Sequence, residues 1–162
     1  MALLANSCAP TSRCAERPCA SATGGVAGAR GRASTVTSGR ANWRLSSCAN
    51  GKAALTDLRA RKVVALLPIG EGPDTAIWDA GHKRFLVPCG KSGTLSVIRM
   101  VGRTPLVEKA VQTEVSARTA AIDAATGRLY LPSARFGPPV AGAKRGAMEA
   151  GSFHVLVMAP RG

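Results

Sequence analysis

Side chains that could carry out chemistry are few and scattered in this 162-residue chain. We interpret its two histidines, His82 in an expected turn and His154 at the start of an expected strand, as structural residues. None of its five cysteines has the Cys-x-x-Cys spacing of a structural zinc site. Since no group of residues forms a catalytic signature, we predict no catalytic residue, no metal site and no cofactor.

The cysteines divide into two groups. Three lie near the N-terminus, namely Cys8, Cys14 and Cys19. Cys48 and Cys89 each follow a short apolar run, and we expect both to be small buried or half-buried residues. A disulfide between Cys48 and Cys89 is an alternative that the sequence leaves open.

The formal net charge of +13 raises the question of a polyanionic partner. The basic residues occur singly along the chain, without a run of five or more, so we do not expect nucleic acid to be a partner. A salt-dependent shift of a DNA fragment would test that alternative. The longest apolar stretch, residues 63–69, has the length of a strand, and we expect no membrane-spanning helix.

Residues 1–42 differ in composition from the rest of the chain. They are rich in Ala, Ser, Arg, Gly and Thr, and large apolar residues almost vanish after Leu4. Such a segment buries too little apolar surface to offset its ordering entropy, so we expect it to be disordered. An alternative is that it derives from a shifted frame or a misassigned start. Its first residues lack the basic region and the apolar length of a signal peptide.

From Trp43 onward, short apolar runs alternate with turn residues, which indicates β-strands. The expected strands are residues 44–48, 53–56, 63–69, 75–78, 84–87, 94–100, 107–115, 119–122, 128–131 and 153–158. Asn50-Gly51 favours a type I′ turn, because both central positions need positive φ. No long window has a 3.6-residue apolar period, so helix content should be low.

The strands recur in an internal repeat. The segment Asp74–Ala80 is matched 44 residues later by Arg118–Ala124, and each is followed by an Arg and an apolar strand that ends in Pro. Trp43-Arg44-Leu45 aligns with Lys83-Arg84-Phe85, 40 residues later. A period of about 40–45 residues with four short strands is typical of a β-propeller blade.

We therefore predict an all-β fold, a partial and open β-propeller of four-stranded antiparallel blades, over residues 43–162. The expected blades are residues 43–73, 74–117 and 118–160. Asp79 and Asp123 should end the innermost strands and accept hydrogen bonds from turn N–H groups. Arg44, Arg84 and Arg128 should open the next strand and brace the turn.

Over residues 43–160 the chain resembles the YVTN-type β-propeller repeat proteins, a WD40-like architecture. The resemblance rests on Lys62–Asp74 as the linker between blades, Ser92–Ile98 as a strand, and Ala117–Pro132 as the next blade. The chain departs from the family at Ser46, Ser47 and Ala54, where bulky residues are usual, and at Pro88-Cys89-Gly90. It also has about two and a half blades, whereas a closed family member has six or seven.

The last repeat offers three strands, residues 119–122, 128–132 and 153–158, and no fourth. In closed propellers the fourth strand often comes from the chain's own N-terminus. We therefore interpret the chain as the C-terminal piece of a truncated family member, with an open ring. Its unpaired strand edges would favour self-association.

The resemblance implies a non-enzymatic binding or scaffold role and a periplasmic or extracellular location, although no signal peptide is readable. The ligand site would lie at the central mouth of the ring, where Asp74 and Arg118 hold equivalent positions and Glu71 lies beside the first. The alternative for all three is a surface turn without a ligand. Two further alternatives are a propeller enzyme of lactonase or quinone-linked dehydrogenase type and a gene remnant without function.

Overall fold

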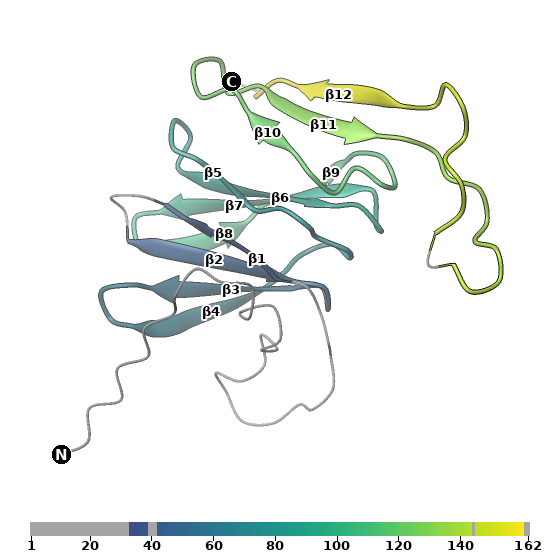
Figure 1. The fold of residues 1–162 in the computed structure, drawn as a ribbon. Helices are drawn as coiled ribbons and strands as arrows, with labels where there is room; N and C mark the ends of the chain where they lie inside the picture. Colours follow the sequence, from purple (N-terminus) through teal and green to yellow (C-terminus); the bar gives the residue numbers. More distant parts are fainter. Residues whose placement is uncertain (1–32, 39–41, 144, 161–162) are drawn as a thin grey trace, which may run out of the picture.

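The computed structural model describes residues 33–38, 42–143 and 145–160, and every regular element in these ranges is a β-strand (Figure 1). The strands form three antiparallel sheets, which confirms the predicted all-β class. No helix in these ranges is long and apolar enough to cross a membrane.

The first two sheets have all four strand positions filled. In the first sheet the order follows the sequence, with β1 (Ala33–Thr37), β2 (Trp43–Cys48), β3 (Lys52–Asp57) and β4 (Lys62–Pro68). The second contains β5 (Ile77–Asp79), β6 (Arg84–Cys89), β7 (Thr94–Val101), β8 (Thr104–Val107) and β9 (Val111–Gln112). Because β8 and β9 both pair with β7, they share the outer position of this sheet.

The third sheet has three strands among the described residues. Its order is β10 (Ala121–Ile122), β11 (Leu129–Ser133) and β12 (His154–Met158). The innermost strands of the three sheets are neighbours, since β5 contacts both β1 and β10. The sheets are therefore arranged like consecutive blades around a common inner edge.

The first strand corrects, for residues 33–37, the prediction that residues 1–42 are disordered. β1 pairs with β2 from Ala33↔Cys48 to Thr37↔Arg44, so the first sheet begins at Ala33 and not at Trp43. The strand needs few large apolar residues, because β-branched Thr and Val favour extended backbone and only Val36 packs against the core. Residues 1–32 and 39–41 lie outside the described residues.

The turn between β2 and β3 also differs from the expected type I′ turn. Gly51 has φ +74°, but Asn50 is not among the residues with positive φ. Cys48 pairs with Lys52, which leaves a three-residue loop. A loop of this length with glycine in the left-handed position is the next most common hairpin connection.

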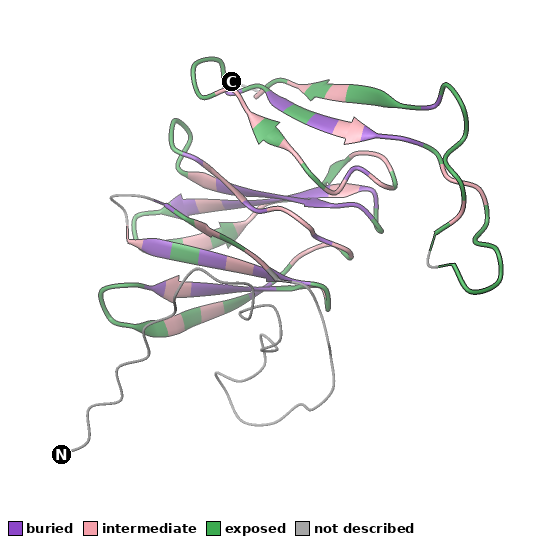
Figure 2. Ribbon diagram, in the orientation of Figure 1, coloured by how far each residue is buried: buried purple, intermediate pink, exposed green. Residues whose placement is uncertain are grey.

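Two apolar layers hold the three sheets together, and the middle sheet contributes to both (Figure 2). Phe85 and Val87 of β6 face the first sheet, whereas Leu86 between them faces the third. The sheet thus buries both faces, which explains why β6 is apolar at almost every position. Full burial of a side chain such as Phe85 contributes about 1.5–3 kcal/mol to stability.

The register of the first sheet differs by one residue from the sequence alignment. That alignment matched Leu45 with Phe85, but Leu45 corresponds to Leu86, because both belong to the layer that faces the following sheet. Their pairings agree, since Leu45 lies opposite Leu55 and Leu86 lies opposite Val97. A shift of one residue moves every side chain of a strand to the other face. The sequence match was therefore wrong at this strand.

This shift explains the outer face of the first sheet. In the second sheet the face toward the first sheet is apolar and carries Phe85, Val87 and Ile98. In the third sheet the face toward the second sheet is also apolar and carries Leu129, Leu131 and Met158. The register-equivalent residues of the first sheet are Arg44, Ser46 and Thr56. Arg44 thus holds the position of Phe85, not that of Arg84. The same face also carries Ala54 and Cys48, which are buried, and Leu66 of β4, which is exposed.

The outer face of the third sheet has the opposite character. Tyr130, Val155 and Val157 are all partly exposed there. Their pairings, Tyr130↔Val157 and Pro132↔Val155, repeat those of Leu86↔Val97 and Pro88↔Leu95 in the second sheet. Since Leu86, Leu95 and Val97 are covered by the third sheet, this face keeps the apolar character of an interior one.

Candidate binding site between the second and third sheets

Two of the three predicted ligand-binding residues lie together. Arg118 precedes β10, Asp74 precedes β5, and the Arg118 Nε atom is 3.5 Å from Asp74 Oδ2. The Arg118 backbone lies tightly over Gly90, where an added Cβ would come within 2.6 Å of Arg118 Cβ. The equivalent positions of two blades therefore meet as an ion pair at the inner edge.

Glu71 is held differently. Its N–H donates to Ser92 Oγ at 3.2 Å, and its carbonyl accepts hydrogen bonds from the N–H groups of Lys91 and Ser92. These bonds attach the linker between the first and second sheets to the turn between β6 and β7. The Glu71 residue is exposed, so it contributes to the surface near Asp74 rather than to the ion pair.

The two aspartates predicted to support turns do so. Asp79 Oδ1 accepts from the His82 N–H at 3.3 Å, and Asp79 Oδ2 lies 2.9 Å from Arg84 Nε. Burial disfavours the charged carboxylate, but the hydrogen bonds from Arg84 and His82 outweigh it, so the pKa of Asp79 is lowered. His82 and Arg84 therefore stabilise this turn through their contacts with Asp79.

The third sheet repeats this turn at Asp123. Its carboxylate accepts from the Thr126 hydroxyl at 2.6 Å and from the Ala125 N–H at 2.9 Å. The hydrogen bond from Thr126, followed by the one from Ala125, lowers the pKa of Asp123. In the second sheet Arg84 donates to the corresponding aspartate, Asp79. In the third sheet the Thr126 hydroxyl occupies the Asp123 oxygen, so among the described contacts Arg128 does not donate to Asp123.

A polar cluster that the sequence did not indicate joins the third sheet to the preceding loop. His154 Nε2 lies 3.0 Å from Glu114 Oε2, and His154 Nδ1 lies 3.0 Å from the Ser152 carbonyl. Ser133 also donates to Glu114, so serine and histidine share one carboxylate instead of contacting each other. A nucleophile needs a base at its own hydroxyl, so this arrangement is structural rather than catalytic.

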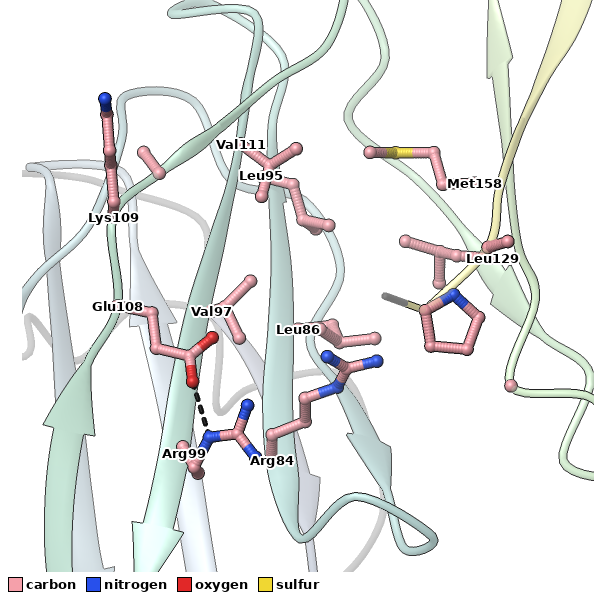
Figure 3. Close-up of a pocket in the computed structure, with 14 residues that line it drawn as sticks. Arg84, Leu86, Leu95, Val97, Arg99, Glu108, Lys109, Val111, Leu129 and Met158 are labelled. Atoms are coloured by element: carbon pink, nitrogen blue, oxygen red, sulfur yellow. Dashed lines mark hydrogen bonds and ion pairs between the residues drawn. The ribbon is translucent and has the colours of Figure 1, made fainter. Parts of the chain in front are cut away.

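A cavity of about 730 Å³ lies between the second and third sheets (Figure 3). Its floor is apolar and comes from both sheets, with Leu86, Leu95, Val97, Val111, Leu129 and Met158. A volume of this size lies within the range of about 300–1,000 Å³ for ligand pockets. The sequence did not predict this site, because its residues are ordinary apolar strand residues. Which of them line a cavity depends on the face of the sheet on which each one lies.

The rim of the cavity is mainly cationic. Arg84, Arg99 and Lys109 line it together with one carboxylate, Glu108. Arg99 Nε lies 2.5 Å from Glu108 Oε1, whereas Lys109 is exposed at the edge (Figure 3). Since Arg84 is paired with Asp79 and Arg99 with Glu108, the site combines an apolar floor with one exposed cation, Lys109, at its rim.

The cavity lies where the third sheet has no fourth strand among its described residues. In the second sheet the outer segment, residues 108–111, forms one wall, and on the opposite side Gly127, Leu129, Met158 and residues 159–160 face it. The described residues contain no group of three or more His, Cys, Asp or Glu residues that could hold a metal ion. The site is thus built for contact with an apolar group.

The structure excludes the disulfide between Cys48 and Cys89 that the sequence left open. Cys89 is a free and fully buried thiol, so it forms no disulfide with Cys48. Burial raises the pKa of the Cys89 thiol, although hydrogen bonds with Ser96 and Gly70 oppose the shift. The residue behaves as a small apolar side chain in the first core layer.

Comparison with known proteins supports the fold. The structure is similar to the β-propeller domain of Cps50 (Swd1) from Myceliophteria thermophila, with a TM-score of 0.52 and 16% identity over 75% of this chain and 44% of that chain. It is also similar to hydrazine synthase from Kuenenia stuttgartiensis, with a TM-score of 0.50 and 14% identity over 57% of this chain and 26% of that one. No protein-family model and no curated protein matches the sequence.

Identities this low show the fold alone. The three sheets are blades of a β-propeller, and the chain spans less than half the length of either similar structure. The resemblance to YVTN-type repeats is more specific than these comparisons show.

Proposed function

We propose that this chain is a non-enzymatic binding or scaffold protein of the YVTN-type β-propeller repeat class. The observation that carries the proposal is the cavity of about 730 Å³ between the second and third sheets, whose apolar floor and cationic rim offer a surface for a partner. The proposed role does not require a closed ring, because both walls of the cavity belong to this chain.

The placement of the charged residues supports a role without catalysis. Three aspartates lie in structural contacts: Asp79 with Arg84, Asp74 with Arg118 and Asp123 with its own turn. A lactonase or quinone-linked dehydrogenase site would instead need carboxylates or histidines that converge from several blades. The ion pair of Asp74 and Arg118, with Glu71 beside it, is proposed as a secondary polar contact at the inner edge.

The metal content of the purified protein tests this proposal against the enzyme alternative. We expect less than stoichiometric metal by elemental analysis, and no change in melting temperature when a chelator is added. Stoichiometric metal that is lost to the chelator together with thermal stability would contradict the binding role.

We further propose that copies of the chain self-associate weakly through open strand edges. An exposed edge presents unpaired N–H and C=O groups that pair readily with another strand. Sedimentation velocity over a range of protein concentrations would show a rising average mass if this occurs. A constant monomer mass up to the highest soluble concentration would contradict it.

A further inference from the structure

We propose that the outer edge of β12 and the adjoining cavity bind an extended, acidic and apolar segment of a partner protein, which adds as the fourth strand of the third sheet. The inference rests on the proposed binding function and names the kind of partner. It follows from the strand pairing, the backbone groups at the edge, the cavity and its charges.

The first two sheets show what the third position of a blade pairs with. β3 occupies that position in the first sheet and pairs with β4 from Lys52↔Pro68 to Asp57↔Lys62. β7 occupies it in the second sheet and pairs with β8 and β9. β12 is their counterpart, and among the described residues it pairs with β11 alone. One edge of β12 is therefore open to a further strand.

Pro132 indicates which backbone groups are available at that edge. It lies opposite Val155 and has no N–H, so the two residues cannot exchange the two hydrogen bonds of a bonded antiparallel pair. The Val155 N–H therefore points to the open edge. The same arrangement is complete in the second sheet, where Pro88 lies opposite Leu95 and Leu95 pairs on its other side with Val111.

The existing fourth strands define the side chains that fit. In β4, Ala65 and Leu67 pack into the first core layer, while Leu66 between them is exposed. In β8, Val107 packs into the same layer. A strand beside β12 would direct its alternate side chains toward the second sheet, which is where the cavity lies. Small and medium apolar residues at alternate positions would fill it.

The charges around the cavity define the ends of the ligand. At the rim Arg84 is paired with Asp79 and Arg99 with Glu108, which leaves Lys109 as the exposed cation beside the cavity, and the whole chain carries +13. A basic peptide would be repelled, whereas Asp or Glu beside the apolar positions would be attracted. The partner is therefore an acidic segment with alternating apolar residues, bound by strand addition.

The test uses the full chain and fluorescent peptides based on β4. One peptide carries residues 61–69 with Glu in place of the two basic residues, Arg61 and Lys62. A second retains those basic residues, and a third carries Asp at the positions of Val63 and Leu66, whose equivalents beside β12 would face the cavity. We expect the acidic peptide to raise the fluorescence anisotropy with micromolar affinity, the basic peptide to bind at least 5-fold more weakly, and the third not to bind.

Variants of the protein locate the bound peptide. Val155→Pro removes the outward N–H without removing a bond to β11, and Val111→Asp places a charge on the cavity floor at an exposed residue. Each should weaken binding at least 10-fold, while Val140→Asp, on a distant exposed loop, should leave it unchanged. The two variants are independent, so a folding defect in one does not remove the test.

Three results would overturn the proposal. They are no binding of the acidic peptide, equal binding of all three peptides, and binding that neither Val155→Pro nor Val111→Asp weakens. A stable dimer of the chain alone that Val155→Pro dissociates would show that a second copy occupies this edge, and would overturn the proposal. Weak association that Val155→Pro leaves unchanged would use another open edge. None of these results changes the metal content, so the broader binding role is tested separately.

Discussion

The Arg103 guanidinium donates a hydrogen bond to the Asp57 carboxylate across the interface between the first two sheets. Asp57 ends β3, and Arg103 lies in the turn between β7 and β8. The same guanidinium lies 5.2 Å from the centre of the Trp43 ring. One side chain thus connects a turn of the second blade to an aspartate and an aromatic ring of the first.

Replacing Asp57 should lower stability more than replacing Arg103. Asp57 also accepts hydrogen bonds from the N–H groups of Arg59 and Ala60. Asp57→Ala therefore leaves these two turn N–H groups and the Arg103 guanidinium without their hydrogen-bond acceptor. Arg103→Ala removes a mostly exposed side chain and leaves the turn intact. Urea denaturation of both variants would check the order, and an equal loss of stability would contradict it.

Truncation of Phe85 should be among the most damaging core changes. The side chain is fully buried between the first two sheets and contacts the Trp78 ring at a centroid distance of 4.6 Å. We expect Phe85→Ala to lower the unfolding free energy by about 3–5 kcal/mol. Phe153→Ala is the matched control, because Phe153 is 60% exposed and should change stability by about 0.5 kcal/mol or less.

Gly90→Ala tests the close approach of the second and third blades. The new Cβ would meet Arg118 Cβ at 2.6 Å and the Arg118 backbone at 3.2 Å, so the chain before β10 must move. We expect a loss of about 1–3 kcal/mol, as for other overpacking changes. Gly81→Ala is the control, since its nearest neighbour lies at 3.6 Å. Equal stability of the two variants would show that the contact between the second and third blades can adjust to the added methyl group at little cost in free energy.

The contact between Glu114 and His154 should stabilise the fold only within a window of pH. Hydrogen bonds to the Ser152 carbonyl and Glu114 raise the pKa of His154 above 6.5, so its contribution is complete below pH 6.5 and is lost as the pH rises through the folded pKa. Hydrogen bonds from Ser133 and His154 lower the pKa of Glu114 below 4.5, so its contribution is complete above pH 4.5 and is lost in more acidic solution.

The measurement is a double-mutant cycle with His154→Gln and Glu114→Gln, followed by thermal denaturation at several pH values. The coupling between the two residues should be largest between pH 4.5 and 6.5 and should fall as the pH rises through the folded pKa of His154. A coupling that does not change with pH would show that protonation of His154 is unimportant.

Cys89 should react with thiol reagents only when the second blade opens. It is fully buried, and burial raises the pKa of its thiol, so both access and thiolate formation are suppressed. Peptide mapping by mass spectrometry after iodoacetamide treatment should show slow alkylation of Cys89 in buffer and rapid alkylation in urea. Rapid alkylation in buffer would indicate that the layer between the first two blades opens readily.

Strand positions and the blade repeat could be predicted because both depend on local patterns. The 44-residue offset from Asp79 to Asp123 identified equivalent turns correctly, since a turn carboxylate leaves a recognisable signature. The first blade was less predictable. Its inner strand, β1, is a short Thr- and Val-containing segment whose pairing with β2 depends on contacts distant in sequence.

The candidate site could be predicted only in part. Asp74 and Arg118 hold equivalent positions before β5 and β10, and their role in ligand binding stays a prediction. Their mutual ion pair depends on the packing of one blade on the next. The cavity left no sequence signal at all. Leu95 and Leu129 are ordinary core residues in the sequence, and they line a site because, among the described residues, one blade has a fourth strand and its neighbour has three strands.

The unlike end faces of the three blades make association self-limiting. If copies stacked head to tail, Arg44 of one would be buried against Val157 of the next, which leaves a cation without a partner in an apolar contact. Two copies that met through their Tyr130 faces would avoid this cost, because Arg44 of each copy would stay in solvent. Growth would therefore stop at two copies, whereas two apolar ends would have allowed an open-ended fibre.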